Sequence, residues 1–369
     1  MAAEISQFKN AQATSKQRNS KKSRARASRL EITTNGVHSL ADVSRVLSIS
    51  FALLLLACEP LRGASQQVSF RIAGKEYIRL ADWAKANGFD LRWIKRDESL
   101  QLGSQSSKIV ITVDSREAQV NGIHAWLSFP AVNQSGAVCL AKLDAQTLLE
   151  PLLSLPKNRT GAKIRTVSLD PGHGGHDPGN HIGSKEEKTY TLLLAQEVRQ
   201  QLIRAGLKAT LTRNTDAFIE LPDRPDLARR QKADLFVSLH FNSADTARNE
   251  VHGSEVYCLT PPGASSTNAR GEGSGAGSFT GNQFNSKNVF LGYQIQRSLT
   301  QSLGVADRGV RRARFAVLRD AAMPAVLIEA GFMSHPVEGR KIFTATYRQQ
   351  MARAIVDGIL AYKRTVERG

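Results

Sequence analysis

The sequence of 369 residues lacks several features that would place a protein in a class at once. Three cysteines are too few for a disulfide framework, and no apolar run reaches the ~20 residues that a membrane-spanning helix needs. The Gly-Lys-Ser/Thr signature of a P-loop is absent. The basic runs contain no interleaved aromatic residues, and no helix-turn-helix or zinc-finger spacing occurs. We therefore expect neither a disulfide-stapled domain nor a P-loop protein, and no nucleic-acid partner.

What the sequence does have is an excess of positive charge, with a formal net charge of +17. The charge is uneven, because residues 1–45 hold nine Lys and Arg residues against three acids, a net charge of +6. This segment is also rich in Ser and Gln and poor in aromatic residues, a composition typical of chains that cannot bury a core. We predict that residues 1–45 are a basic disordered segment.

Residues 46–58, VLSISFALLLLAC, follow as a short uncharged apolar stretch. They suit the apolar region of a secretory signal peptide, and a true translation start near Val43 would explain the long basic part before them. The final LLAC also resembles the lipobox of bacterial lipoproteins, in which Cys58 would carry a lipid. A cleaved signal, a lipid anchor and an uncleaved anchor all place the body in the periplasm or cell envelope. Membrane contact is then expected only through this segment or the lipid.

Residues 66–155 combine short strands, tight turns and short helices, which predicts a small α+β accessory domain. Asn121-Gly122 is a strong hairpin signal, and Ser135-Gly136 marks another turn. The order of elements resembles the small domain at the N-terminus of copper amine oxidases, which implies adhesion or positioning and no chemistry. Residues 156–163, PKNRTGAK, have the composition of a linker.

From residue 164 to 369 strands alternate with helices, which predicts an α/β fold with a mixed twisted sheet covered by helices on both faces. Reacting groups in such folds gather at strand ends. Residues 261–286 are rich in Gly, Ser and Asn, and we expect an open, flexible loop without a helix that plugs the site. The predicted strands are 163–169, 208–213, 234–240, 253–260, 315–319 and 325–332, and the predicted helices are 189–206, 224–232, 288–304 and 347–364.

The densest motif is LDPGHGGHDPG, residues 169–179. It fails the dinucleotide-loop template because the third glycine is missing, and its prolines disfavour the helix that a phosphate loop opens. A metal site is the better interpretation. Imidazole is a common zinc ligand, and a catalytic zinc takes three protein ligands and leaves one position open for water. His173 is the first candidate ligand, because it lies just beyond a predicted strand.

Other positions supply further candidate ligands and acids. His240 ends the apolar run DLFVSLH, where the alternative is a core histidine. Glu186 and Glu187 lie at the start of a predicted helix, where acids are also ordinary partners of the helix dipole. Glu329 lies within AVLIEAGF, and burying a carboxylate there is costly unless it has a partner or a function. The alternative is a glutamate at a strand edge that faces water.

Together these pieces resemble the zinc-dependent N-acetylmuramoyl-L-alanine amidases of bacterial cell-wall metabolism, the amidase type 3 catalytic domain. LDPGHGGHDPG, EEKTYTLLLA, LFVSLHFNSA and DRGVRRARFAVLRDAAMPAVLIEAGFMSH occur in the family's order within residues 164–366. The resemblance implies that His173, Glu187 and His240 bind one Zn²⁺ and that Glu329 is the catalytic acid and base. It implies that a zinc-activated water cleaves the amide between N-acetylmuramic acid and L-alanine of peptidoglycan.

The resemblance suggests further roles around this site. Asp170 is a candidate to orient His173 from behind the metal. Arg224 is expected to be structural or to face the substrate, and Asn242 to contact the substrate or support the site. The residues that could compete for the metal are His176, His181 and Glu186.

The implied partners are peptidoglycan and an activator protein. Two rival functions remain open: a carboxypeptidase or endopeptidase that acts on the peptide stems, and a non-catalytic wall-binding protein that keeps the fold. The presence of all four proposed site residues argues against the second rival. We expect Cys139 and Cys258 to be partly buried thiols.

Overall fold

The computed structural model describes residues 69–158, 161–268 and 277–368. These residues form one compact unit. The predicted segments at 1–45 and 46–58, with the cysteine that ends the second, lie outside the described residues. In the part of the chain that the structure describes, no helix is both long and apolar enough to span a bilayer.

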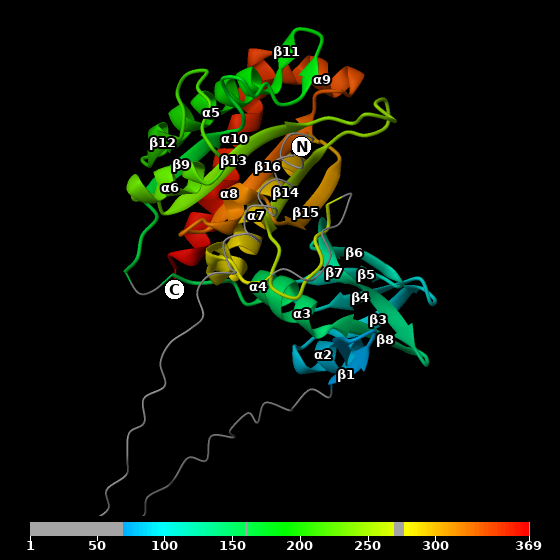
Figure 1. Cartoon of the computed structure of the whole chain (residues 1–369). Helices are drawn as coiled ribbons and strands as arrows, with labels where there is room; N and C mark the ends of the chain where they lie inside the picture. Colours follow the sequence, from blue (N-terminus) through cyan, green and yellow to red (C-terminus); the bar gives the residue numbers. More distant parts are fainter. Residues whose placement is uncertain (1–68, 159–160, 269–276, 369) are drawn as a thin grey trace, which may run out of the picture. The chain divides into compact units, whose positions relative to one another are not determined.

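The first part of this unit is built from antiparallel strands and short helical segments (Figure 1). This part confirms the predicted small α+β region, including the helical close at LDAQTLLEPLL. Its strands are β1 (Ser69–Ile72), β2 (Lys75–Arg79), β3 (Asp90–Lys95), β4 (Ser99–Gly103), β5 (Lys108–Thr112), β6 (Ser115–Val120), β7 (Ile123–Gln134) and β8 (Ala137–Ala141). Its helical segments are α2 (Leu80–Ala86), α3 (Lys142–Asp144), the π-helix η1 (Ala145–Leu149) and α4 (Glu150–Leu153).

Two predicted turns adopt the backbone that their residues favour. Asn121 and Gly122 have φ of 50° and 82°, and Ser135 and Gly136 have φ of 52° and 83°. Positive φ at both central residues is the type I′ geometry, which matches the twist of the flanking strands. The turns therefore join β6 to β7 and β7 to β8 as hairpins.

The second part alternates strands and helices (Figure 1). Its strands lie in the order β12-β9-β13-β16-β14-β15, and the sheet is mixed because β14 runs antiparallel to β16 while the other pairs are parallel. The strands are β9 (Thr166–Pro171), β12 (Lys208–Leu211), β13 (Leu235–Asn242), β14 (Ser254–Leu259), β15 (Asp307–Ala313) and β16 (Ala325–Phe332), with a separate ribbon of β10 (His181–Ile182) and β11 (Lys185–Glu186). The helices are α5 (Glu187–Arg204), α6 (Asp223–Arg230), the 3-10 helix η2 (Thr280–Phe284), α7 (Asn285–Leu303), α8 (Ala316–Arg319), α9 (Pro336–Ile342) and α10 (Ala345–Val366).

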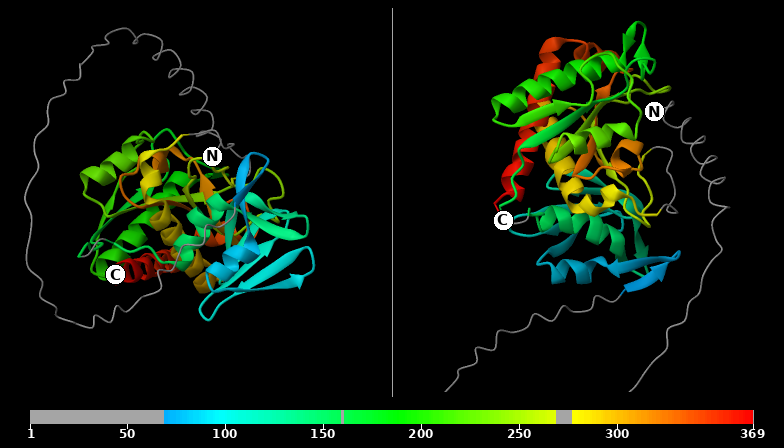
Figure 2. Two further views of the ribbon diagram at one scale, coloured as in Figure 1. Left: turned by 90° about the horizontal axis from the view of Figure 1, so that it is seen from below. Right: turned by 60° about the vertical axis from the view of Figure 1, so that its left-hand side comes forward.

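The two faces of this sheet bury different helices, because side chains alternate across each strand. Val237 and Ile328 belong to a large apolar core with residues of α5, α7 and α10. Phe236 and Leu327 belong to a smaller core with residues of α6 and α8. Figure 2 shows α10 in red running beside α7 on the first of these faces. Helices therefore cover both faces, which confirms the predicted fold class.

One predicted strand is wrong. Residues 315–319, FAVLR, are expected to be a strand, but Ala316–Arg319 form α8, because a short apolar run does not distinguish a strand from a helix. The strand at this place is β15, whose sequence DRGVRRA has no apolar alternation. Its arginines contact neighbouring strands and loops, so the usual pattern of a buried strand is absent.

The loop at 261–286 is also not open and flexible over its described residues. Arg314 Nη2 donates to the carbonyl of Ala264 at 2.8 Å, and Ala264 is fully buried. The other end of the loop forms η2. Residues 269–276 lie outside the described residues, so the absence of a plugging helix stays a prediction.

Strand β7 of the first part pairs with β15 of the second, so one sheet runs through both parts. Trp126 Nε1 donates to the carbonyl of Arg308 at 2.9 Å, and the Tyr293 hydroxyl donates to the carbonyl of Val120 at 3.0 Å. Backbone pairing and side-chain contacts therefore connect the two parts. The linker expected at 156–163 stays a prediction.

Both described cysteines are buried and unbridged. Burial raises the pKa of the Cys258 thiol to about 11, which disfavours the reactive thiolate. Burial also raises the pKa of Cys139. Neither thiol is therefore suited to nucleophilic chemistry.

Candidate metal centre

The parallel strands β9, β13 and β16 bring the expected site residues to one edge of the sheet. His240 and Glu329 are Cα partners in β13 and β16. Side chains separated by an even number of residues in a strand lie on the same face of the sheet. His240 is separated in this way from Phe236, and Glu329 from Leu327, and both partners belong to the smaller core. The side chains of His240 and Glu329 therefore lie on the face that α6 and α8 cover. His173 comes after β9, which pairs with β13. The carboxyl ends of neighbouring strands thus place these groups together.

The structure brings together the three residues expected to bind metal. Ligand atoms of His173, Glu187 and His240 lie within 4.8 Å of one another, and all three residues are buried. His173 Nε2 lies 3.2 Å from Glu187 Oε2, and His240 Nδ1 lies 3.0 Å from Glu187 Oε1. We call these three residues the metal group.

Glu187 is the first residue of α5, and two backbone donors and one side-chain donor hold its carboxylate in place. The backbone N–H and the side-chain Nδ2 of Asn180 both donate to Oε2 at 2.9 Å, and the backbone N–H of Phe241 donates to Oε1 at 3.0 Å. Burial would raise the pKa of Glu187, but His173 and His240 hold it well below its usual range. The carboxylate is therefore ionised, which is the form that binds a metal.

Asp177 fixes the orientation of His173. Its Oδ2 lies 2.8 Å from His173 Nδ1, and a proton on Nδ1 leaves the lone pair of Nε2 facing Glu187. Burial would lower the pKa of His173, but Glu187 and Asp177 outweigh burial and raise the pKa to about 10. A bound cation would therefore have to displace a proton from this imidazole.

The metal group fits a zinc ion by the chemistry of its donors. Two imidazoles and one carboxylate are a donor set of catalytic zinc sites, which keep a fourth position for water. Nε2 of His173 is buried and makes no hydrogen bond of good geometry among the described residues, although Glu187 Oε2 lies 3.2 Å away. Such an atom is costly to bury, and coordination would satisfy it. Over the described chain no other group of three His, Cys, Asp or Glu side chains has ligand spacing.

Glycines of LDPGHGGHDPG make the room that the imidazoles occupy. A Cβ on Gly172 would lie 2.2 Å from Cε1 of His240. Gly179 has φ of +67°, and a Cβ there would lie 2.6 Å from Cδ2 of His173. The motif is therefore a packing surface for the metal group and also contributes one of its members, His173.

Asp170 does not orient His173, contrary to our expectation. Asp170 is buried within the sheet, and its carboxylate accepts hydrogen bonds from Arg224 Nη1 at 2.9 Å and from Thr212 Oγ1 at 2.6 Å. Arg224 Nη2 donates to the backbone carbonyl of His173 at 3.0 Å. Asp170 thus acts on the backbone of the loop through Arg224, and Asp177 makes the direct contact with the imidazole.

Two buried arginines hold the carbonyl groups of the loop after β9. Arg224 Nη1 and Arg213 Nε both donate to the carbonyl of Pro171 at 3.0 Å, and Arg213 Nη2 donates to that of Gly172 at 2.8 Å. Burial and the neighbouring Arg224 lower the pKa of Arg213 to about 10. Of the two roles expected for Arg224, these contacts favour the structural one.

The competing residues lie outside the metal group. Glu186 Oε2 lies 3.5 Å from Lys188 Nζ, and its side chain is 44% exposed. His176 is exposed, and its ring centroid lies 4.0 Å from that of Phe218. His181 is exposed in β10. Each competitor therefore has other contacts or faces solvent.

A second carboxylate, Glu255, accompanies Glu329. The two residues are Cα partners across β14 and β16, and both are buried. Glu255 Oε1 accepts a hydrogen bond from Asn242 Nδ2 at 2.8 Å, and Oε2 lies 3.1 Å from Arg308 Nε and 2.8 Å from Arg311 Nε. Asn242 therefore supports the site through Glu255.

Sequence reasoning missed several residues of this site. Asp177 lies in the motif LDPGHGGHDPG, four residues after His173, and its spacing was an available signal. Asn180 was visible as a departure from the family pattern, and Glu255 as an acid in the apolar run SEVYCL. Arg213 had no local signal, because its partners are backbone carbonyls that only the fold brings near.

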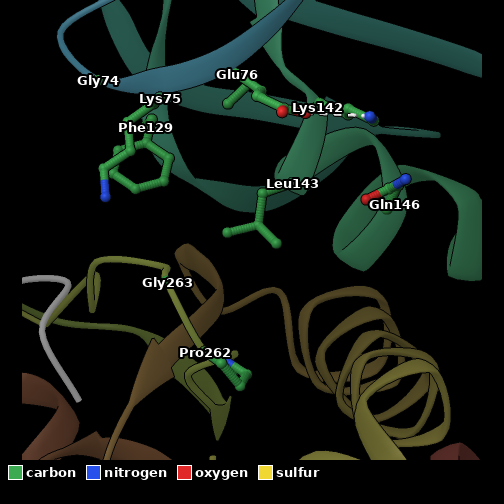
Figure 3. A pocket seen from close by; sticks show the side chains of 10 residues that line it. Gly74, Lys75, Glu76, Phe129, Lys142, Leu143, Gln146, Pro262 and Gly263 are labelled. Carbon is green, nitrogen blue, oxygen red and sulfur yellow. Dashed lines mark hydrogen bonds and ion pairs between the residues drawn. The ribbon is translucent and has the colours of Figure 1, made fainter. Parts of the chain in front are cut away.

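A hollow of about 370 Å³ lies apart from the metal group (Figure 3). Residues of β2, β7 and α3 line it together with Pro262 and Gly263. Figure 3 shows Lys75 beside Phe129, whose ring centroid is 5.1 Å from Nζ. No member of the metal group lines this hollow, so it is not part of the candidate centre.

The second part of the chain is similar to characterised proteins. The family described as N-acetylmuramoyl-L-alanine amidase matches residues 167–361. The chain is 35% identical over 234 residues to the N-acetylmuramoyl-L-alanine amidase AmiA of Escherichia coli K12, which covers 57% of this chain and 80% of that protein. It is 35% identical over 199 residues to the amidase LytC of Bacillus subtilis 168, covering 54% of this chain and 36% of that protein.

The chain is also similar in sequence to a protein of solved structure. The amidase AmiC2 of Nostoc punctiforme is 33% identical, over 55% of this chain and 99% of its own, with a TM-score of 0.46. Because the family match spans more than half of the sequence, membership follows from it. The chain belongs to the N-acetylmuramoyl-L-alanine amidases, peptidoglycan hydrolases that cleave the amide bond between N-acetylmuramic acid and the L-alanine of the stem peptide.

Proposed function

We propose that His173, Glu187 and His240 bind one zinc ion and that Glu329 is the catalytic acid and base of the amidase reaction. Bound zinc would acidify a water molecule and polarise the amide carbonyl. The observation that carries this proposal is the buried group of two imidazoles and one carboxylate in register with Glu329.

Glu329 moves the proton in this mechanism. Its position beside His240 in the adjacent strand allows it to take a proton from the attacking water. It then returns that proton to the amine of L-alanine as the amide bond breaks. A buried carboxylate suits both steps, because it is kept from bulk water while the proton is in transfer.

The remaining residues keep the site in order. Asp177 holds His173 in the tautomer that offers Nε2. Asn180 fixes the carboxylate of Glu187. Arg224 donates a hydrogen bond to the backbone carbonyl of His173, which keeps the loop in place at the end of β9.

The test is digestion of purified sacculi by the full chain, with products identified by mass spectrometry. We expect free stem peptides and intact glycan strands, loss of activity with a chelator, and recovery on addition of Zn²⁺. Shortened peptides still attached to glycan would instead identify a hydrolase of the peptide stems. Activity that survives complete removal of metal would overturn the proposed centre.

We further propose that the protein is exported to the periplasm or cell envelope. The proposal is supported by the apolar stretch at 46–58, and it implies either a cleaved signal or a lipid on Cys58. N-terminal sequencing of the protein recovered from the envelope would find a start beyond residue 45. An N-terminus at residue 1 in a cytoplasmic fraction would contradict export.

The first part of the chain is proposed to position the enzyme on the wall. Residues 66–155 would act as the accessory domain and 164–369 as the catalytic domain, and an activator protein is a further candidate partner. Binding of the inactive chain to sacculi, compared before and after substitution of exposed residues of 66–155, tests the positioning role. Unchanged binding by every such variant would contradict it.

A further inference from the structure

Arg308 is a partly exposed cation beside the catalytic edge of the sheet. It lies in β15, and its side chain is 30% exposed, whereas its partner Glu255 is 4% exposed. Nε pairs with Glu255 Oε2 at 3.1 Å. Among the described residues, the two terminal nitrogens of Arg308 have no hydrogen-bond partner. They are therefore available to a ligand.

The guanidinium of Arg308 is held in one place. Its Cζ lies 4.9 Å from the centroid of Phe332, the last residue of β16. The backbone carbonyl of Arg308 accepts a hydrogen bond from Trp126 Nε1 at 2.9 Å. A planar cation fixed by an acid, an aromatic ring and its own backbone loses little entropy on binding a second anion.

The carboxylate of Glu255 does not cancel this charge. Glu255 is shared between Arg308 and Arg311, and its other oxygen accepts from Asn242 and from the Tyr257 hydroxyl. One carboxylate thus contacts two guanidinium groups, and neither terminal nitrogen of Arg308 is used in its pair with Glu255. Arg308 lies to one side of the metal group, since β15 is separated from β13 by β16 and β14.

The distance from the metal group sets which part of the substrate could reach Arg308. The guanidinium contacts Phe332 in β16, the strand next to that of His240. Neighbouring strands lie about 4.8 Å apart, so the guanidinium is roughly one to two such spacings, ~5–10 Å, from the ligand strand. An extended peptide advances ~3.5 Å per residue. The group that Arg308 meets is therefore about two or three residues from the scissile amide.

We propose that Arg308 is a specificity residue that binds a free carboxylate on the second or third residue of the stem peptide. A guanidinium binds a carboxylate through paired hydrogen bonds, and an amidated group offers no charge to it. The inference deepens the proposed amidase function and rests on it. The enzyme is then selective for stems that keep these carboxylates free.

The test compares two muramoyl tripeptides that differ only in whether the carboxylates of residues two and three are free or amidated. For the wild-type full chain we expect kcat/KM to be about 10–100-fold higher with the free form, mainly through KM. Arg308→Gln abolishes this preference, and Arg308→Lys keeps part of it. Arg353→Gln, an exposed arginine of α10, is the control and keeps the preference.

The outcomes separate a binding role from a structural one. Loss of rate by the same factor on both substrates in Arg308→Gln would show that the residue only supports Glu255, and would overturn the proposal. Equal rates of the wild type on both substrates would also overturn it. Calorimetric titration of the same two peptides gives the preference as a Kd ratio even if neither is hydrolysed. Absent hydrolysis by the wild type would count against the amidase function, while the Kd ratio would still decide the role of Arg308.

Discussion

At the residue scale, the metal group combines a carboxylate with two imidazoles, which suits two states: one with a proton on His173 and one with a bound cation. Glu187 lies between His173 and His240, and Asp177 lies behind the first imidazole. Without a cation, the carboxylates keep His173 protonated, with its pKa raised to about 10. A divalent ion would replace that proton and use the same atoms. Metal binding and proton release are therefore linked in this site.

The first prediction at this scale separates catalysis from metal binding. Glu329→Gln should lower kcat by about 10²–10⁴-fold, because the amide cannot accept the proton. Metal content should stay unchanged, since Glu329 is not in the metal group. Glu220→Gln, an exposed position, is the control. Loss of zinc from Glu329→Gln would instead make this residue a ligand.

The second prediction concerns Asp170, whose role is structural. Asp170→Asn should lower the free energy of unfolding at neutral pH by about 3–5 kcal/mol, because it leaves the buried Arg224 without its charged partner. Urea denaturation measures the change, and Asp226→Asn in an exposed ion pair is the control. An equal effect of the two substitutions would contradict the buried pair.

The stability lost in Asp170→Asn should depend on pH, because the carboxylate of Asp170 is protonated in acid. Burial would raise the pKa of Asp170, but Arg224, Thr212 and Ser238 together lower it. A folded-state pKa below the unfolded value of ~3.9 stabilises the fold above about pH 4, and the stability is lost as the pH falls through the folded pKa. The difference between wild type and Asp170→Asn should therefore shrink in acid.

At the element scale, the loop after β9 and the start of α5 together make the site. The strand ends at Pro171, and the loop then turns back so that Gly172 and Gly179 pack on the two imidazoles. α5 begins at Glu187, so the helix start and the proposed ligand coincide. A loop that is rich in glycine is here a close-packed part of the site, because the imidazole rings of His173 and His240 fill the space of the missing side chains.

This packing gives a prediction with a matched control. Gly179→Ala should lose most of the bound zinc, because its Cβ would lie 2.6 Å from the ring of His173 and 2.7 Å from Glu187 Oε2. Gly183→Ala has a similar φ, +58°, but nothing lies within 4 Å of its Cβ. Both variants carry the same backbone strain, so only the first should lose metal, as measured by elemental analysis. Equal zinc loss in both would assign the effect to strain.

At the scale of the whole molecule, one sheet passes from the first part into the second. β7 pairs with β15, and Trp126 contacts both the carbonyl of Arg308 and the guanidinium of Arg311, 4.3 Å from its ring. The arginines beside Glu255 are therefore held partly by the first part of the chain. A contact of this kind couples the folding of the two parts.

That coupling predicts a single unfolding transition. All three tryptophans, Trp83, Trp93 and Trp126, lie in the first part, so fluorescence reports mainly on it and, through Trp126, on its contact with β15. Far-ultraviolet circular dichroism reports mainly on the long helices α5, α7 and α10 of the second part. The two signals should have the same thermal midpoint, because coincident transitions mark one cooperative unit. Separate midpoints would instead support two domains joined at 156–163.

Turns and buried strands of this fold could be predicted, because the residues within each of these segments are enough to determine its conformation. Asn121-Gly122 favours one turn type, and the apolar runs of β13 and β16 are typical of buried strands. β15 was not predictable, because its arginines make contacts far along the chain. α8 was mistaken for a strand because four residues carry no period.

The sequence by itself determined the fold class and the residue types of the site, because alternation, turn residues and motif order are local properties of the chain. It left open which of Glu186 and Glu187, and which of the nearby histidines, join the metal group. Tertiary structure decided this, because α5 buries Glu187 and leaves Glu186 beside solvent. It also gave His173 its partner Asp177 and placed Arg308 near the edge of the sheet, since both depend on distances that only the folded chain fixes.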